Sequence, residues 1–340
     1  MAETRCAHGV AGGAGTLRSS SSFAGHPPIS SAGCAAPYFE REPHREAVVR
    51  AIKAGRVPLK FAYAGSAAHT HDAYARSDDY LSMLTSARHE ADALVAADVV
   101  AAGELRLAEI GPGNGSRSRA FLDRLADRGL PCQRYLALDF SETLLGLACA
   151  RVARFAGDPM SVDSHVWDIE HGTSGCVERW RAGPGPVVSC LLGHTLGNVE
   201  RPDEVLANIH DALRAGDVLL LSVAVGTADC PVPDAVLAPY RSPEFRAAAL
   251  QPLLAAGLVE ADLEFALSWH NDVVVGEAVL RRSVRLDGWP LRAGHRIRCF
   301  QSRRFRTRDV IVAVGESGWQ VRDAVQVPGG SHLVVTASWR

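Results

Sequence analysis

A glycine-dense turn constrains this chain more than any other feature of its sequence. The turn is Glu109-Ile-Gly111-Pro-Gly113-Asn-Gly115; it follows a short apolar run, and the next apolar run ends on Asp139 and Phe140. Glycines let a backbone approach a ligand closely, and the helix N-terminus behind them favours negative charge. The acid at the end of the second run can accept both hydroxyl protons of a ribose. A strand, a tight turn, a helix and an acid-tipped strand predict half of a nucleotide-binding site.

The alternation of apolar runs with amphipathic segments continues to residue 225. Residues 187–192 and 217–225 predict the fourth and fifth strands, and Pro202 begins the helix between them. Ser116 and Ser141 are predicted to cap the helices that follow the first two strands. The fold class is therefore α/β, with a doubly wound parallel sheet.

The end of the chain distinguishes between versions of this fold. Residues 307–318 predict a helix, and residues 319–325 and 332–338 predict two strands joined through Pro328-Gly329-Gly330. A terminal β-hairpin on a parallel sheet resembles the class I methyltransferase version of the fold and not the dehydrogenase version.

These patterns divide the chain into five segments. We expect an Ala/Gly/Ser-rich disordered start, helices of a substrate-binding part, a nucleotide-binding domain, an insertion that completes the substrate-binding part, and a closing helix with a hairpin. Their boundaries are predicted at 1–36, 37–103, 104–225, 226–306 and 307–340.

Composition limits the classes of partner. The net charge is −2, so it does not favour nucleic acid or a membrane surface. The longest apolar run, residues 218–225, has the length of a strand and is far too short for a membrane span. Eight cysteines without a C-x-x-C pair predict reduced thiols in the cytoplasm and no metal. We expect a small-molecule substrate; the oligomeric state is not fixed.

The glycine spacing predicts the cofactor. The turn reads G-x-G-x-G, whereas dinucleotide enzymes carry G-x-G-x-x-G, and Ser116 holds the last position here. Together with Asp139 this favours S-adenosylmethionine. Asp168, near the end of the predicted third strand, can accept the adenine amino proton, although a loop carboxylate or helix cap is the alternative. The predicted cofactor-binding residues are Glu109, Gly111, Gly113, Asp139, Phe140, Asp168 and Ile169.

A second motif indicates which family of enzymes the chain resembles. The segment Leu191-Leu-Gly193-His-Thr195-Leu-Gly197-Asn198 follows the fourth strand. It resembles the F-L-G-S-T-I-G-N signature of histidine-specific N-methyltransferases of the ergothioneine type. The resemblance runs from about Phe61 to the C-terminus and implies methylation of the α-amino group of an amino acid by S-adenosylmethionine.

The resemblance also implies acceptor-binding residues. Asn198 and Tyr240 would hold the amino-acid carboxylate and amine and are the predicted catalytic residues. Tyr80 falls near a further substrate-side tyrosine of the family, and Phe61 or Tyr63 falls near another. A turn residue is the alternative for Asn198, and an amphipathic rim position is the alternative for each tyrosine.

One departure from the family bears on the acceptor. Where the family has a Glu and a Ser that bind the imidazole of histidine, this chain has Phe300 and Ser302. Losing the carboxylate costs roughly 1.5–3 kcal/mol of preference for imidazole. We therefore expect an amino acid other than histidine, with an apolar or aromatic side chain. His194 replaces a family serine and is either a proton acceptor or a structural histidine.

Other functions stay open at this point. An O- or C-methyltransferase of secondary metabolism would keep the cofactor and change the acceptor. A catalytically silent cofactor-binding module would keep the fold alone. A nicotinamide dehydrogenase is disfavoured by the glycine spacing and the hairpin. The arginines at positions 296–308 suit the solvent face of a strand better than RNA binding.

Overall fold

The computed structural model describes residues 39, 41–76, 85–100, 105–154, 160–226 and 233–339. Its α-helices are α1 (Glu42–Lys53), α2 (Ser66–Tyr74), α4 (Thr85–Ala96), α5 (Ser116–Asp127), α6 (Glu142–Ala153), α7 (Cys176–Trp180), α8 (Thr195–Asn198), α9 (Pro202–Asp211), α10 (Pro233–Leu237), α11 (Pro243–Ala255) and α12 (Thr307–Glu316). Its short 3₁₀ segments are η1 (Leu59–Tyr63), η3 (Ile169–His171), η4 (Ala238–Tyr240) and η5 (Glu260–Asp262). Its strands are β1 (Leu105–Ile110), β2 (Cys132–Asp139), β3 (Ser161–Val166), β4 (Val188–Leu191), β5 (Val218–Ala224), β6 (Leu263–His270), β7 (Val273–Leu280), β8 (Val284–Leu286), β9 (Trp289–Leu291), β10 (Arg296–Arg303), β11 (Trp319–Gln326) and β12 (His332–Trp339).

Seven strands form the main sheet, in the order β11-β12-β5-β4-β1-β2-β3. Strands β1 to β5 pair in parallel, and β12 pairs antiparallel with both β5 and β11. The order reverses direction beside β1, because the chain goes from β1 outward to β3 and then returns to β4 on the other side. The carboxyl edge at such a switch point is where α/β sheets bind ligands. The predicted α/β class, parallel sheet and terminal hairpin are confirmed.

Alternation along the strands gives the sheet two buried faces. In β1, Leu105 and Leu107 join one cluster of buried side chains, and Ala108 and Ile110 join the other. Helices α4, α5 and α6 contribute to the first cluster, and α7, α9 and α12 contribute to the second. The sheet is thus covered on both sides, as period-two alternation in a parallel sheet requires.

The predicted helix starts are correct at two of three positions. The Ser141 hydroxyl accepts from the Leu144 backbone N–H at 3.2 Å and caps α6. Pro202 occupies the first turn of α9. The Ser116 cap is wrong: the N-cap of α5 is Gly115, and the Asn114 side chain accepts from the Ser116 N–H at 3.0 Å. The asparagine therefore does the capping from inside the glycine turn.

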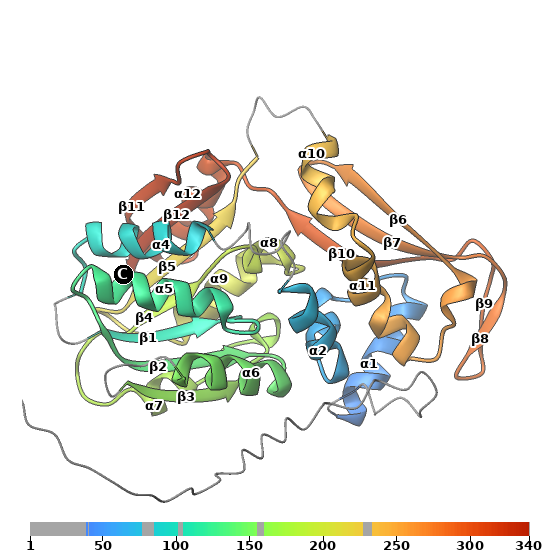
Figure 1. Cartoon of the computed structure of the whole chain (residues 1–340), viewed down its shortest axis with the longest axis horizontal. Helices are drawn as coiled ribbons and strands as arrows, with labels where there is room; N and C mark the ends of the chain where they lie inside the picture. Colours follow the sequence, from blue (N-terminus) through green and yellow to red (C-terminus); the bar gives the residue numbers. More distant parts are fainter. Residues whose placement is uncertain are drawn as a thin grey trace, which may run out of the picture. The chain divides into compact units, whose positions relative to one another are not determined.

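Helix α4 belongs to the main sheet. Its Ala87, Ala91 and Leu94 are buried in the same cluster as Leu105 of β1 and Phe121 of α5, and α4 lies beside α5 (Figure 1). The small alanines permit this close helix–helix packing. The expectation that residues 37–103 all belong to the substrate-binding part is corrected accordingly. The helix ends at Ala96, and Asp98 follows it with a φ of 48°.

A second cluster of buried side chains lies outside the main sheet. It joins α1, η1 and α11 to a three-stranded antiparallel sheet in the order β10-β7-β6. The strands of this sheet come from the predicted insertion and the helix α1 comes from the N-terminal segment, so two distant stretches of chain share one core (Figure 1). No helix among the described residues is long and apolar enough to cross a membrane. The predicted disorder of residues 1–36 concerns a segment outside the described residues.

Candidate functional site

A cavity of about 220 Å³ opens at the carboxyl edge of β1, β2 and β4. Its walls come from the main sheet on one side and from η1, α2, α11 and β10 on the other. Most of the predicted site residues line it, namely Gly111, Gly113, Asp139, Phe140, Asp168, Ile169, Tyr63, Asn198, Tyr240, Phe300 and Ser302. Glu109 does not line it, and Tyr80 falls outside the described residues.

The glycine turn lies directly against the cavity. Gly111 and Gly113 have φ angles of 70° and 57°, a region that side-chain-bearing residues avoid. A Cβ on Gly111 would lie 3.0 Å from the Thr195 methyl carbon, so that position also has no room for one. The Gly111 N–H donates to the Leu138 carbonyl at 2.8 Å, which ties the turn to β2.

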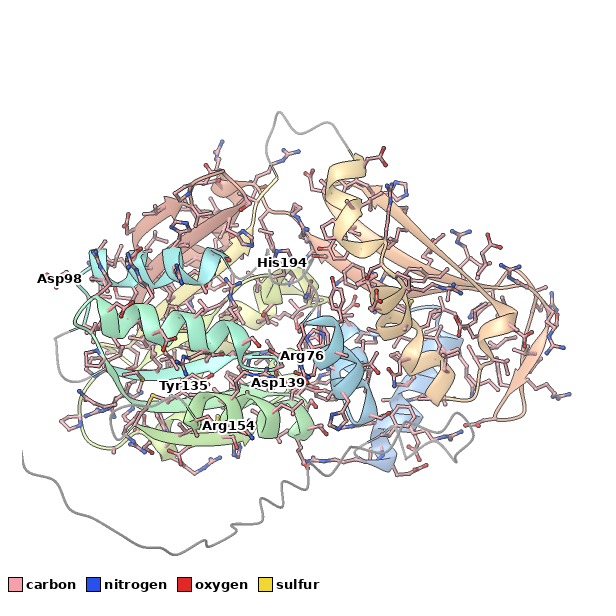
Figure 2. All side chains as sticks on the ribbon, viewed as in Figure 1. Arg76, Asp98, Tyr135, Asp139, Arg154 and His194 are labelled. Atoms are coloured by element: carbon pink, nitrogen blue, oxygen red, sulfur yellow. The ribbon has the colours of Figure 1, made fainter. Side chains whose placement is uncertain are left out.

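Asp139 ends β2 and lines the cavity, as predicted; its position beside α6 and α2 is visible in Figure 2. One of its carboxylate oxygens accepts from the Ser141 N–H at 3.0 Å, which fixes the carboxylate at the start of α6. Phe140 packs edge-on against Phe61 of η1 with a centroid distance of 5.5 Å. The second strand therefore presents a carboxylate and an apolar ring side by side.

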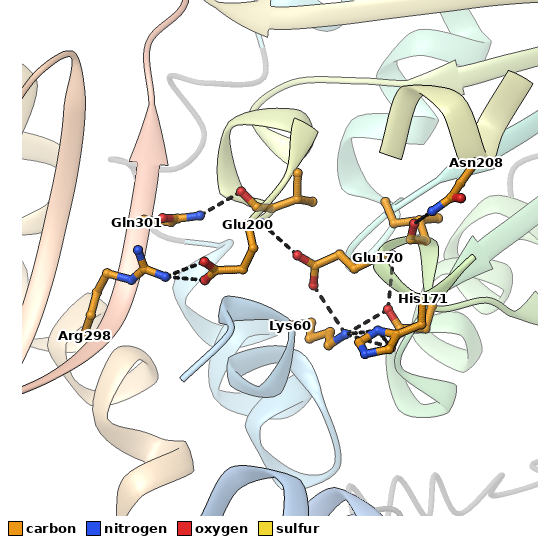
Figure 3. Close-up of polar contacts among 10 residues, drawn as sticks. Lys60, Glu170, His171, Glu200, Asn208, Arg298 and Gln301 are labelled. Carbon is orange, nitrogen blue, oxygen red and sulfur yellow. Dashed lines mark hydrogen bonds and ion pairs between the residues drawn. The ribbon is translucent and has the colours of Figure 1, made fainter. Parts of the chain in front are cut away.

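Asp168 caps the short η3 turn and forms an ion pair that the sequence did not reveal. The Lys60 Nζ donates to the two Asp168 oxygens at 2.9 and 2.7 Å and lies 3.3 Å from a Glu170 oxygen. It also lies 5.3 Å from the centroid of the Phe140 ring. Figure 3 shows Lys60 reaching Glu170 and His171 from a different part of the chain.

The contacts around Lys60 continue into the second core. The Glu200 N–H donates to Glu170 at 2.8 Å, and the Glu200 carboxylate pairs with Arg298 of β10 (Figure 3). Gln301 of β10 donates to the Val199 carbonyl at 2.7 Å. These contacts join η1 and β10 to the loops after β3 and β4, and they fix one side of the cavity.

Glu109 is the one predicted cofactor-binding residue that does not line the cavity. Its carboxylate is 2% exposed and accepts from the Tyr135 hydroxyl at 2.7 Å, behind the turn and away from the cavity. Burial raises the pKa of the Glu109 carboxyl, and the hydrogen bond from Tyr135 opposes this shift. Successive side chains of a strand point to opposite faces of the sheet. The Glu109 side chain points to a face that helices cover, so it lies in the core.

Two further groups line the cavity beside Gly193. Arg117 lies in the first turn of α5 and forms an ion pair with the buried Glu90 of α4. His194, labelled in Figure 2, has its Nε2 3.1 Å from the Nε2 of His332. Burial lowers the pKa of His194 and lowers the pKa of His332 to about 4, with further lowering by Arg304 and Arg117. Both rings are therefore neutral near pH 7, and one donates to the other.

Asn198 and Tyr240 approach the cavity from opposite sides. Asn198 is the last residue of α8, and its Oδ1 is buried without a hydrogen-bond partner. Tyr240 is 5% exposed, and its hydroxyl lies 3.3 Å from the Ser302 hydroxyl of β10. A buried acceptor without a donor is costly, and a ligand donor or an ordered water in the cavity would satisfy it.

Aromatic rings form the wall around Phe300. Phe300 follows a bulge in β10 and is 5% exposed. Its ring packs edge-on against Phe245 at 4.7 Å and lies 5.0 Å from Tyr240. Tyr74 of α2 packs against Phe245 at 5.9 Å, on the same wall.

The sequence-based search missed Lys60, His71, Tyr74, Arg117 and Arg304. His71 of α2 lines the cavity, packs on Tyr63 at 4.6 Å, and has a pKa lowered to about 4 by burial. Asp72 beside it accepts from Asn114 of the glycine turn at 2.9 Å. No pattern in the sequence marks these contacts, because each joins segments that are distant along the chain. Arg117 alone had a signal, since it lies in the first turn of the helix that follows the glycines.

These residues fit the predicted cofactor. Gly111 and Gly113 put bare backbone against the cavity, Asp139 and Asp168 supply acceptors, and Phe140 and Ile169 supply apolar surface. Arg117 adds a cation beside the turn, where the carboxylate of a methionine group would be favoured.

Comparison with known proteins gives one matching family model. A model of the family "histidine-specific methyltransferase, SAM-dependent" matches residues 56–338. No curated protein sequence matches the chain. Similar solved structures include a magnesium protoporphyrin IX methyltransferase from Synechocystis, 12% identical, covering 82% of this chain and 96% of that one, with a TM-score of 0.43.

Two other structures are comparably distant. An S-adenosylmethionine-dependent methyltransferase from Clostridium acetobutylicum is 10% identical, covers 73% of this chain and 88% of its own, and has a TM-score of 0.41. An amino pentose methyltransferase from Micromonospora echinaspora is 17% identical, with coverages of 75% and 91% and a TM-score of 0.36. The match to the family model over most of the chain is the stronger finding: this protein belongs to the histidine-specific, S-adenosylmethionine-dependent methyltransferase family and is an S-adenosylmethionine-dependent methyltransferase.

Proposed function

We propose that the protein methylates the α-amino group of an amino acid whose side chain is aromatic or apolar, and that histidine is not its preferred acceptor. The observation that carries the proposal is the pairing of Asn198 Oδ1, a buried acceptor without a partner, with the ring wall around Phe300 in one cavity. An amine needs the first feature, and an apolar side chain needs the second.

Each element of the proposed acceptor has a counterpart. The amine would donate to Asn198 Oδ1, and the carboxylate would accept from the Tyr240 hydroxyl. Phe300, Phe245 and Tyr74 would surround the side chain with offset and edge-on contacts, which aromatic rings favour. The imidazole of histidine would instead leave its N–H groups facing Phe300, where no carboxylate accepts them.

Methyl transfer to a neutral amine does not require a strong general base. Bound S-adenosylmethionine supplies a methyl group on a sulfonium, which a neutral amine can attack in line. Asn198 and Tyr240 would hold the amine and carboxylate so that the nitrogen lone pair faces the methyl group, and positioning of this kind accounts for much of such a rate enhancement. The apolar rings exclude water from the acceptor. The ammonium proton would leave to solvent before attack, because the low pKa values of the buried histidines make them poor proton acceptors.

The test is methyl transfer from isotopically labelled S-adenosylmethionine to equal amounts of amino acids, decarboxylated amines, phenols and thiols. We expect label on the α-nitrogen of an aromatic or apolar amino acid, located by fragmentation in mass spectrometry. Label on an oxygen or carbon, on histidine in preference to the others, or on none of these acceptors would contradict the proposal.

An Asn198→Ala variant adds a second test. We expect the acceptor Kd to rise about tenfold to hundredfold, since a hydrogen bond to a buried acceptor is lost. The Kd of S-adenosylmethionine should stay as in the unaltered protein, because Asn198 lies at the acceptor end. Equal losses of both affinities in calorimetry would argue against this assignment.

A further inference from the structure

Arg304 contacts two of the hydroxyl groups at the acceptor end of the cavity. It lies just beyond β10, and its Nη1 donates to the Ser302 hydroxyl at 2.9 Å. Its Nη2 donates to the Tyr240 hydroxyl at 2.8 Å. One planar guanidinium thus joins a residue of η4 to a residue of β10, which are far apart in the sequence.

The chemistry of the guanidinium fixes the role of both hydroxyls. Arginine has five N–H donors and no acceptor, so the oxygens of Tyr240 and Ser302 must accept from it. Tyr240 also lies within reach to donate to Ser302, at 3.3 Å, which is longer than an ordinary bond between two hydroxyls. Each hydroxyl has one proton, and the Tyr240 proton can turn from this long contact to a stronger acceptor. The pair therefore has two protons that it can donate to an anionic group.

The charge of Arg304 points to an anionic acceptor. Its hydrogen-bond partners among the described residues are Ser302, Tyr240 and the Arg303 carbonyl, none of which is a carboxylate. Two other arginines near the cavity differ: Arg117 pairs with Glu90, and Arg298 pairs with Glu200. Within the part of the chain that the structure describes, the positive charge of Arg304 is therefore not balanced by an ion pair.

Arg304 does not itself line the cavity, whereas Tyr240 and Ser302 do. Ser302 is 1% exposed, so its hydroxyl can donate a hydrogen bond to a group inside the cavity but not to bulk solvent. A hydrogen bond from a hydroxyl that accepts from a cation is polarised and stronger than one from an isolated hydroxyl. Arg304 would act through these two hydroxyls and is a positioning residue.

We propose that Arg304 makes Tyr240 and Ser302 a joint binding site for the carboxylate of the acceptor. Ser302, which the family resemblance assigns to the side chain of the acceptor, then recognises the carboxylate instead. The side-chain end of the cavity is left to the rings around Phe300. This inference rests on the proposed function, because it assumes an acceptor with a carboxylate next to its amine.

Its first test compares each amino acid that the enzyme methylates with the matching decarboxylated amine. The unaltered enzyme should prefer the acid. In Arg304→Met, KM for the acid should rise about tenfold to hundredfold with a smaller change in kcat, while values for the amine stay nearly constant. Arg304→Lys should recover part of the preference, because a lysine restores the charge and one donor. A merely structural arginine would affect acid and amine alike.

A control variant and a second test variant accompany this experiment. Arg306→Met removes an exposed arginine two positions away and should leave the acid preference unchanged. Ser302→Ala keeps Arg304 and should reduce the preference through the second hydroxyl. Calorimetry with S-adenosylmethionine on each variant checks folding, and we expect unchanged cofactor affinity in all of them.

A binding experiment separates this inference from the proposed function. Titration of 3-phenylpropionate and 3-phenylpropanol into the protein saturated with S-adenosylhomocysteine requires no turnover. The carboxylate should bind more tightly than the alcohol to the unaltered protein, and Arg304→Met should remove that difference. If amino acids are methylated but Arg304→Met keeps the acid preference, the inference is wrong and the proposed function stands. If no amino acid is methylated yet the carboxylate preference depends on Arg304, the anion site stands and the proposed function is wrong.

Discussion

The two ends of the cavity are built in different ways. The cofactor end comes from short stretches at the strand ends, with Gly111 and Gly113 after β1, Asp139 at the end of β2, and Asp168 after β3. The acceptor end is assembled from η1 and α2, from η4 and α11, and from β10. The cofactor end could therefore be predicted from local sequence patterns. Residues of the acceptor end such as Tyr240, Phe300 and Ser302 were predicted only through the family resemblance, because their segments meet by packing.

The two ends also differ in charge. The cofactor end gathers Asp139, Asp168 and Glu170, with Lys60 bonded to the last two. The acceptor end is a wall of aromatic rings with one guanidinium behind it. We therefore expect substitutions at the cofactor end to change cofactor affinity and leave acceptor choice nearly constant. Substitutions at the acceptor end should do the reverse.

The largest expected effect is at the cofactor end. Asp139→Ala removes the carboxylate that would accept two ribose hydroxyl protons, and each such bond contributes about 1.5–3 kcal/mol. The Kd of S-adenosylmethionine should rise by about hundredfold or more in calorimetry. Asp163→Ala, at a half-buried carboxylate on β3 that does not line the cavity, serves as the matched control. An Asp139 variant with unchanged affinity would show that this carboxylate does not bind the cofactor.

The next effect concerns acceptor choice. Phe300→Glu returns a carboxylate to the ring wall and should shift the ratio of kcat/KM for histidine over phenylalanine by about tenfold to hundredfold towards histidine. Phe300→Leu keeps the wall apolar and should leave histidine disfavoured. Cofactor affinity is expected to stay constant in both. A shift in cofactor affinity without a shift in acceptor ratio would show that the two ends are not separable.

A smaller effect follows from the histidine pair between the two ends. The pKa of His332 is lowered to about 4 by burial and by the nearby Arg117 and Arg304. Its unfolded pKa is near 6.5, so the unfolded chain binds more protons between these values and stability falls as the pH falls from about 6.5 to 4. Between pH 7 and pH 5 this group should lower the free energy of unfolding by about 2 kcal/mol. His332→Gln should remove that part of the slope in urea unfolding measured at several pH values; an identical slope in both proteins would contradict the lowered pKa.

The smallest effect is expected from Lys60, which joins the two parts of the cavity wall. Lys60→Met leaves Asp168 and Glu170 without their shared cation and loosens the carboxylate that would face the adenine. We expect S-adenosylmethionine to bind about fivefold more weakly, or about 1 kcal/mol. Lys53→Met is the control, since Lys53 is the other lysine of the chain and lies over the Trp289 ring. An effect at Lys53 as large as at Lys60 would show that the Asp168 pair is incidental.

The sequence predicted the sheet because period-two and helical patterns are local, and Gly111 and Asp139 because they follow strand ends. The contact of Glu109 with Tyr135 was not predicted, because the glycine motif does not tell which face of the sheet the carboxylate enters. The cap at Ser116 was predicted wrongly because serine and asparagine side chains can both cap a helix. The pattern does not tell which of Asn114 and Ser116 does so. Lys60, His71 and Arg304 were not predicted, because their contacts form only when distant segments pack together. Tyr80 lies outside the described residues and stays a prediction.

The most direct measurement of the account is a competition for a limiting amount of methyl donor. Histidine and tryptophan at equal concentration are incubated with the unaltered enzyme and labelled S-adenosylmethionine, and the label on each is counted by mass spectrometry. The ring wall around Phe300 predicts at least about tenfold more label on tryptophan. Equal labelling, or more label on histidine, would contradict it.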